Sequence, residues 1–92
     1  MESRDFAAIE RQLYSILDEL RDELSTAERT EVTEFMAVGE YGVALETLSG
    51  LLAEEDKAVP LAAFERMVDL AESMGIRRAV ITSKLGRRVI RE

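Results

Sequence analysis

This sequence of 92 residues contains no cysteine, no histidine and no tryptophan. Without cysteine and histidine the chain cannot form a disulfide, a Cys/His zinc site or a Ser-His-Asp triad. Carboxylates, lysine, tyrosine and hydroxyl groups remain, but no arrangement of them converges on one reaction. We therefore expect no enzyme and neither a metal ion nor another cofactor.

Long apolar runs are also absent, because the longest uninterrupted ones are three or four residues. No segment is expected to span a bilayer. The start of the chain, residues 1–5, lacks the basic and apolar regions of a signal peptide. Yet 47% of the residues are apolar, which is too many for a disordered chain. We expect a folded, soluble, cytoplasmic protein with one domain, residues 1–92, because the length leaves no room for a second core.

Charge is distributed unevenly along the chain. Residues 1–75 hold 18 acidic and 6 basic side chains, whereas residues 76–92 hold 6 basic side chains and 1 acidic one. The whole chain has a net charge of −7, which disfavours nucleic acid as a partner and suits a basic protein. The basic segment, about residues 76–92, is expected to be a helix or a tail that neutralises acidic neighbours. A contact with phosphate through residues 77–91 stays open as an alternative.

Apolar residues recur at steps of three and four, which is the helical period. Ser25 and Glu28 are spaced as a capping box, Pro60 suits a helix start, and Gly39 and Gly75 suit helix ends. These signals predict helices over about residues 4–24, 26–38, 40–55, 60–74 and 77–90. The sequence therefore predicts an all-α fold, a small bundle of four to five helices.

The last predicted helix is the least regular, because Gly86 interrupts it. Its end, Val89 and Ile90, is β-branched, so a strand is possible there, although no pairing partner is apparent. The expected core is Phe6, Leu13, Leu17, Leu20, Phe35, Leu45, Leu48, Leu52, Phe64, Met67 and Val68.

The junction before the third predicted helix contains a dense motif, residues 39–48. Gly39 permits a positive φ, and Gly42 permits another backbone to approach the first helical turn. Tyr41 is expected to bury its ring. Packing alone accounts for these residues, whereas Glu40 and Glu46 face outward and are equally consistent with binding a partner.

The run from Phe35 to Pro60 resembles the core of MafI-type immunity proteins, small bacterial proteins of polymorphic toxin systems. The shared pattern is Gly-Glu-Tyr-Gly-x-Ala-x-Glu-x-Leu, then a leucine pair and acidic residues, and the similarity extends weakly over about residues 25–75. The matching positions are Gly39, Glu40, Tyr41, Gly42, Ala44, Glu46, Leu48, Leu51, Leu52 and Glu54.

The resemblance implies a non-enzymatic protein that binds and neutralises a cognate toxin domain, frequently a nuclease, in the cytoplasm of the producing cell. An acidic helical surface is compatible with a basic toxin domain and a one-to-one complex. We expect the contacts at Glu40, Glu46, Glu54, Glu55 and Asp56, which flank one helix and its end. Among the motif residues, Gly39, Tyr41, Gly42, Ala44 and Leu48 are expected to be structural.

An alternative class is a helical scaffold or regulatory module. Such a protein could form a homodimer through Val43, Leu51 and Met74, which this interpretation takes to be exposed.

Overall fold

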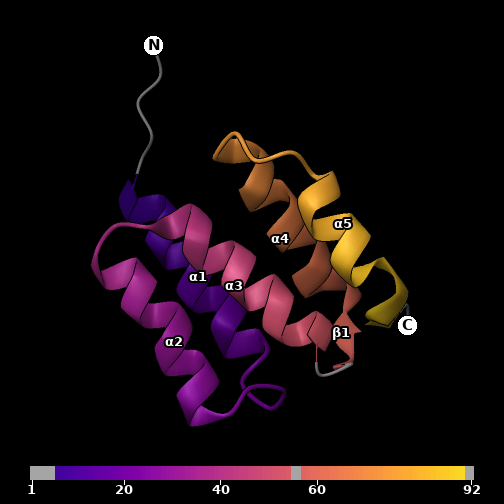
Figure 1. The fold of residues 1–92 in the computed structure, drawn as a ribbon. Helices are drawn as coiled ribbons and strands as arrows, with labels where there is room; N and C mark the ends of the chain where they lie inside the picture. Colours follow the sequence, from indigo (N-terminus) through magenta and orange to yellow (C-terminus); the bar gives the residue numbers. More distant parts are fainter. Residues whose placement is uncertain (1–5, 55–56, 91–92) are drawn as a thin grey trace.

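The computed structural model describes residues 6–54 and 57–90, and in these ranges the chain forms five α-helices and one short pair of strands (Figure 1). The all-α bundle predicted from the sequence is confirmed. None of the described helices has the length and apolar content needed to cross a membrane. The elements in chain order are α1 (Phe6–Glu19), α2 (Thr26–Ala37), α3 (Tyr41–Glu54), β1 (Val59–Pro60), α4 (Leu61–Ser73), α5 (Ala79–Leu85), a 3-10 turn (Gly86–Arg88) and β2 (Val89–Ile90).

Helix α3 is the centre of the bundle, because it packs against α1, α2, α4 and α5 (Figure 1). Its buried side chains include Ala44, Leu45, Leu48 and Leu52. Ser49 is also fully buried, and its hydroxyl donates a hydrogen bond to the Leu45 carbonyl at 3.0 Å. The one polar side chain in the described core therefore has its partner within the same helix.

The expected core is largely confirmed. Phe35 and Phe64 are only half-buried, although both pack against the core. The expectation for Phe6 is wrong, because its side chain is 55% exposed at the first turn of α1. The remaining expected core residues are buried, namely Leu13, Leu17, Leu20, Leu45, Leu48, Leu52, Met67 and Val68.

Helix α1 ends at Glu19 rather than near residue 24. After Leu20 the backbone hydrogen bonds change from i−4 to i−3 partners, so the last turn tightens and the helix stops. The Arg29 guanidinium, from α2, donates to the Leu17 carbonyl at 3.3 Å and thereby satisfies a carbonyl near the end of α1.

The capping box at the start of α2 is confirmed. The Glu28 amide donates to the Ser25 hydroxyl at 3.0 Å, and the Ser25 amide donates to the Glu28 carboxylate at 2.8 Å. Two otherwise unpaired amides are satisfied in this way.

The described part of the basic C-terminal segment, residues 76–90, folds onto the bundle, but not as the predicted helix over residues 77–90. Helix α5 ends at Leu85, and Ile81 and Leu85 are buried. The chain then becomes β2, which pairs in parallel with β1, Val59 opposite Val89 and Pro60 opposite Ile90. The sequence offers no apparent pairing partner for a strand at Val89, and in the structure that partner is β1, directly before α4.

Helix α2 ends in a left-handed turn at Gly39, whose φ is +79°. The Gly39 amide donates to the Met36 carbonyl at 3.0 Å, and the Glu40 amide donates to the Phe35 carbonyl at 2.9 Å. This pair of bonds is a Schellman motif, which closes the end of the helix and reverses the chain. The glycine predicted to end this helix has the expected conformation.

Helix α4 ends in the same way at Gly75, whose φ is +81°. The Gly75 amide donates to the Glu72 carbonyl at 3.0 Å, and the Ile76 amide donates to the Ala71 carbonyl at 2.8 Å. Two Schellman turns therefore direct the chain into α3 and into the segment before α5.

Substituting Gly39 and Gly50 by alanine tests the left-handed turn, because a Cβ meets no atom within 4 Å at either position. We expect Gly39→Ala to lower the free energy of unfolding by about 1–2 kcal/mol, because its φ is unfavourable for alanine. Gly50→Ala, inside α3, should raise it by about 0.5–1 kcal/mol, because alanine favours a helix. Urea denaturation measures both; changes of the same sign would contradict this account.

Candidate functional site

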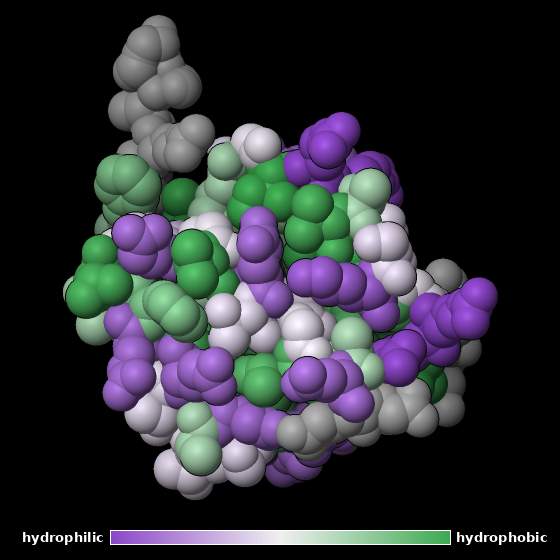
Figure 2. Space-filling view, in the orientation of Figure 1, coloured by the Kyte–Doolittle hydropathy of each residue, from purple (hydrophilic) through white to green (hydrophobic). Residues whose placement is uncertain are grey.

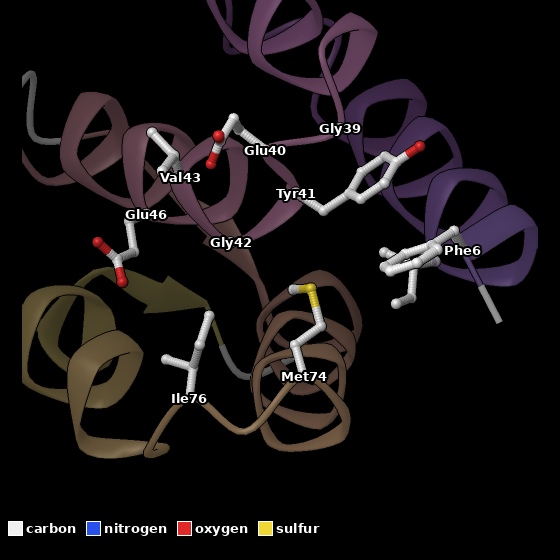
Figure 3. Close-up of a pocket in the computed structure, with 10 residues that line it drawn as sticks. Phe6, Gly39, Glu40, Tyr41, Gly42, Val43, Glu46, Met74 and Ile76 are labelled. Atoms are coloured by element: carbon white, nitrogen blue, oxygen red, sulfur yellow. The ribbon is translucent and has the colours of Figure 1, made fainter. Parts of the chain in front are cut away.

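An open groove of about 290 Å³ lies where the first turns of α1 and α3 meet the chain that follows α4 (Figure 3). We call it the α3 groove. In the space-filling view, hydrophobic residues gather on the part of the surface over the starts of α1 and α3 (Figure 2). The residues that line the groove are Phe6, Ile9, Gly39, Glu40, Tyr41, Gly42, Val43, Glu46, Met74 and Ile76.

One wall of the groove is aromatic. The rings of Phe6 and Tyr41 are stacked, with centroids 5.8 Å apart and planes 21° from parallel. Tyr41 is half-buried, whereas Phe6 is 55% exposed. This stack joins the start of α1 to the start of α3 and presents aromatic surface to solvent at the groove.

Gly42 forms part of the groove together with Ile76. A Cβ built on Gly42 would lie 3.4 Å from Cδ1 of Ile76, which is ordinary contact at the close end of its range. The sequence predicted the approach of another backbone at Gly42, and this is wrong, since the neighbour is an aliphatic side chain. Ile76 is half-buried and follows the left-handed turn at Gly75.

The charged residues that line the groove are Glu40 and Glu46, and both are exposed. Neither carboxylate makes an ion pair or side-chain hydrogen bond with another residue in ranges 6–54 and 57–90. In Figure 3 they lie on one side of the groove, with Phe6 and Tyr41 on the other. The site therefore combines apolar surface with two carboxylates that have no positive neighbour bound to them.

The other acidic residues expected to bind a partner do not join this group. Glu54 is exposed at the opposite end of α3, about 20 Å from Glu40 along the helix axis. Glu55 and Asp56 lie outside the described residues. The structure thus brings two of the five expected contacts together and separates a third from them.

The family-like motif divides between the core and the groove. Ala44 and Leu48 are fully buried, in agreement with their expected structural role. Gly39, Tyr41 and Gly42 shape the junction and also line the groove. The motif therefore contributes residues both to the core of the bundle and to the accessible groove.

The sequence analysis does not bring Phe6, Ile9, Met74 and Ile76 together in a site, although all four line the groove. The apolar stripe of α1 predicts Phe6 in the core, whereas its ring stacks on Tyr41 and stays 55% exposed. Met74, expected to be exposed, is only 9% exposed. Ile76 had one usable signal, since an apolar residue directly after a helix-ending glycine frequently packs back on that helix.

The surface proposed for a homodimer is not formed as expected. Of its three residues, Met74 is buried and Leu51 is half-buried against the core. Val43 is 41% exposed and lines the groove. The expected exposure of Met74 is wrong, so this interface has less apolar area than the sequence indicated.

Basic residues gather on α5 and its flanks, and the first of them, Arg77, directly follows the groove residue Ile76. Arg77, Arg78, Lys84 and Arg87 are exposed. The Arg78 guanidinium lies 3.6 Å from the Glu72 carboxylate, and both side chains are largely exposed. This pair is an example of the expected neutralisation of acidic neighbours, and at this exposure it contributes about 0–1 kcal/mol of stability.

Within residues 6–54 and 57–90, no three acidic side chains lie close enough together to hold a metal ion. What the groove offers is recognition: apolar contact on one side and attraction of positive charge on the other. No family model matches the chain, and no curated protein or solved structure proves similar to it.

The Phe6–Tyr41 stack can be tested with Phe6→Leu, which keeps an apolar side chain but removes the ring. We expect a loss of about 0.5–1.5 kcal/mol in the free energy of unfolding, the range measured for aromatic pairs. Near-ultraviolet circular dichroism should change in the tyrosine band, because Tyr41 is one of only two tyrosines. Tyr14→Leu, at the other tyrosine, identifies which ring carries the signal. An unchanged tyrosine band in Phe6→Leu would contradict the stack.

Proposed function

We propose that this chain is an immunity protein that binds and neutralises a basic toxin domain, as its resemblance to MafI-type proteins implies. The observation that supports this most is the clustering of the accessible motif residues. Glu40 and Glu46, which neither the packing of α3 nor the turn at Gly39 requires, line one groove together with Gly39, Tyr41 and Gly42. A binding surface explains why these two carboxylates belong to the same pattern.

The charge of the groove agrees with such a partner. A nuclease toxin must attract phosphate, so its functional surface is basic, and exposed carboxylates on a helix end attract the same surface. Glu40 and Glu46 are available for this because no described base neutralises them. In this proposal the complex is one-to-one and forms in the cytoplasm of the producing cell, with a rate of association that falls as salt rises.

The proposed function is tested by expressing the chain with the protein encoded immediately upstream of its gene. We expect that protein to arrest growth, the chain to restore it, and the two to co-purify as a one-to-one complex. Glu40→Lys with Glu46→Lys should abolish the rescue, because two attractive contacts become repulsive.

The matched control is Glu31→Lys with Glu34→Lys, which makes the same charge change at two exposed positions of α2. This control should retain the rescue, and circular dichroism should show both double variants folded. A harmless upstream protein that does not co-purify would overturn the proposed function. Equal rescue by the two double variants would show that the partner does not bind at the α3 groove.

A further inference from the structure

We infer that the α3 groove is a binding site for one arginine side chain that a protein partner presents beside an apolar residue. The inference rests on the proposed function only for the source of the arginine, a basic protein. It names the chemical group that the groove recognises and assigns Phe6, Tyr41 and Ile76 a role in binding that group.

The size of the groove limits what it can hold. Its volume of about 290 Å³ is at the lower limit of the roughly 300–1,000 Å³ typical of ligand sites, so it accommodates one or two side chains rather than a helix. It is also open to solvent along its length, as the exposed Phe6 and Val43 at its edges indicate. A side chain from a partner's surface can therefore enter without any rearrangement of the bundle.

The groove has two chemically different sides. Phe6 and Tyr41 supply aromatic surface on one side, whereas Glu40 and Glu46 supply negative charge on the other, where Ile76 adds aliphatic surface (Figure 3). Arginine has the complementary halves, because its aliphatic stem packs on apolar surface and its guanidinium remains charged. The planar guanidinium also stacks on aromatic rings and donates to carboxylates, which lysine does less well.

The charge of the groove excludes other occupants. Of the described residues that line it, those with a charge are both acidic, so a phosphate or a carboxylate is repelled. A purely apolar side chain would take water from two carboxylates without replacing their hydrogen bonds. A second copy related by a two-fold axis at the groove would bring Glu40 and Glu46 against their own equivalents, which is unfavourable.

The two halves contribute differently to binding. Exposed carboxylates chiefly accelerate association and select for positive charge, whereas the apolar contacts, once water is excluded, slow dissociation. The Phe6–Tyr41 stack is therefore the part of the groove that should retain the bound side chain, and Glu40 with Glu46 the part that should discriminate against uncharged ones.

The probe for this inference is the peptide acetyl-Leu-Arg-Leu-amide, titrated into the isotope-labelled full chain and followed by amide chemical shifts. Its controls replace arginine by citrulline, which has nearly the same shape without the charge, or by glutamate. We expect saturable shifts at Glu40, Tyr41, Gly42 and Ile76. Citrulline should bind about tenfold more weakly, because charge-assisted contacts are roughly twice as strong as neutral ones, and glutamate should not bind.

Matched variants separate the two halves. Glu40→Gln with Glu46→Gln should remove the preference for arginine over citrulline, whereas Glu31→Gln with Glu34→Gln should keep it. Phe6→Ala should weaken both peptides, because it removes apolar contact, and the arginine peptide more, because its guanidinium also loses an aromatic ring on which to stack. Phe6 is largely exposed, so this variant is expected to fold.

The inference is overturned if no peptide binds, if citrulline binds as well as arginine to the unmodified chain, or if the shifts lie on α5. Sedimentation of the chain alone should show a monomer, and a stable dimer through the groove would also overturn it. The peptide titration uses no toxin, and the rescue experiment uses no peptide. Rescue without peptide binding discards only the arginine site, and peptide binding without a toxic neighbour discards only the immunity function.

Discussion

The left-handed backbone at the ends of α2 and α4 is the constraint on which this arrangement depends. Gly39 and Gly75 have nearly the same positive φ, and each closes its helix with the same pair of hydrogen bonds. Helix α3 starts two residues after Gly39, and Ile76 follows Gly75 directly. Both therefore lie close to the helix that precedes them. The α3 groove is formed where the residues after these two turns meet the start of α1.

A single helix provides both the centre of the bundle and much of the candidate site. Buried residues of α3 such as Ala44 and Leu48 pack against the surrounding helices, and the exposed Val43 and Glu46 alternate with them, whereas Glu40 directly precedes the helix. Because the same turns carry both sets, the outward residues are held on a rigid element. The outward residues of α3 therefore need little further ordering on binding, in contrast to the start of α1.

The sequence could predict what depends on near neighbours in the chain. The capping box at Ser25 and the helix-ending Gly39 need only a few adjacent residues, and both have the expected geometry. The exposure of Phe6 and the pairing of Val89 with Val59 depend on residues far away in the chain, and no local pattern contains that information. For the same reason the sequence could assign Glu40 and Glu46 to an outer face of the bundle. It could not predict that they line one groove with Ile76, which lies far from them in the chain.

The position of Phe6 has a consequence for the dynamics of the groove. It is the first residue of α1, and the ends of a helix open at far lower free energy than its centre. The aromatic wall is therefore formed in part by the segment of α1 that frays most readily. Any ligand that holds Phe6 against Tyr41 must order this turn, so its binding should carry an unfavourable conformational entropy and should slow amide exchange at the start of α1.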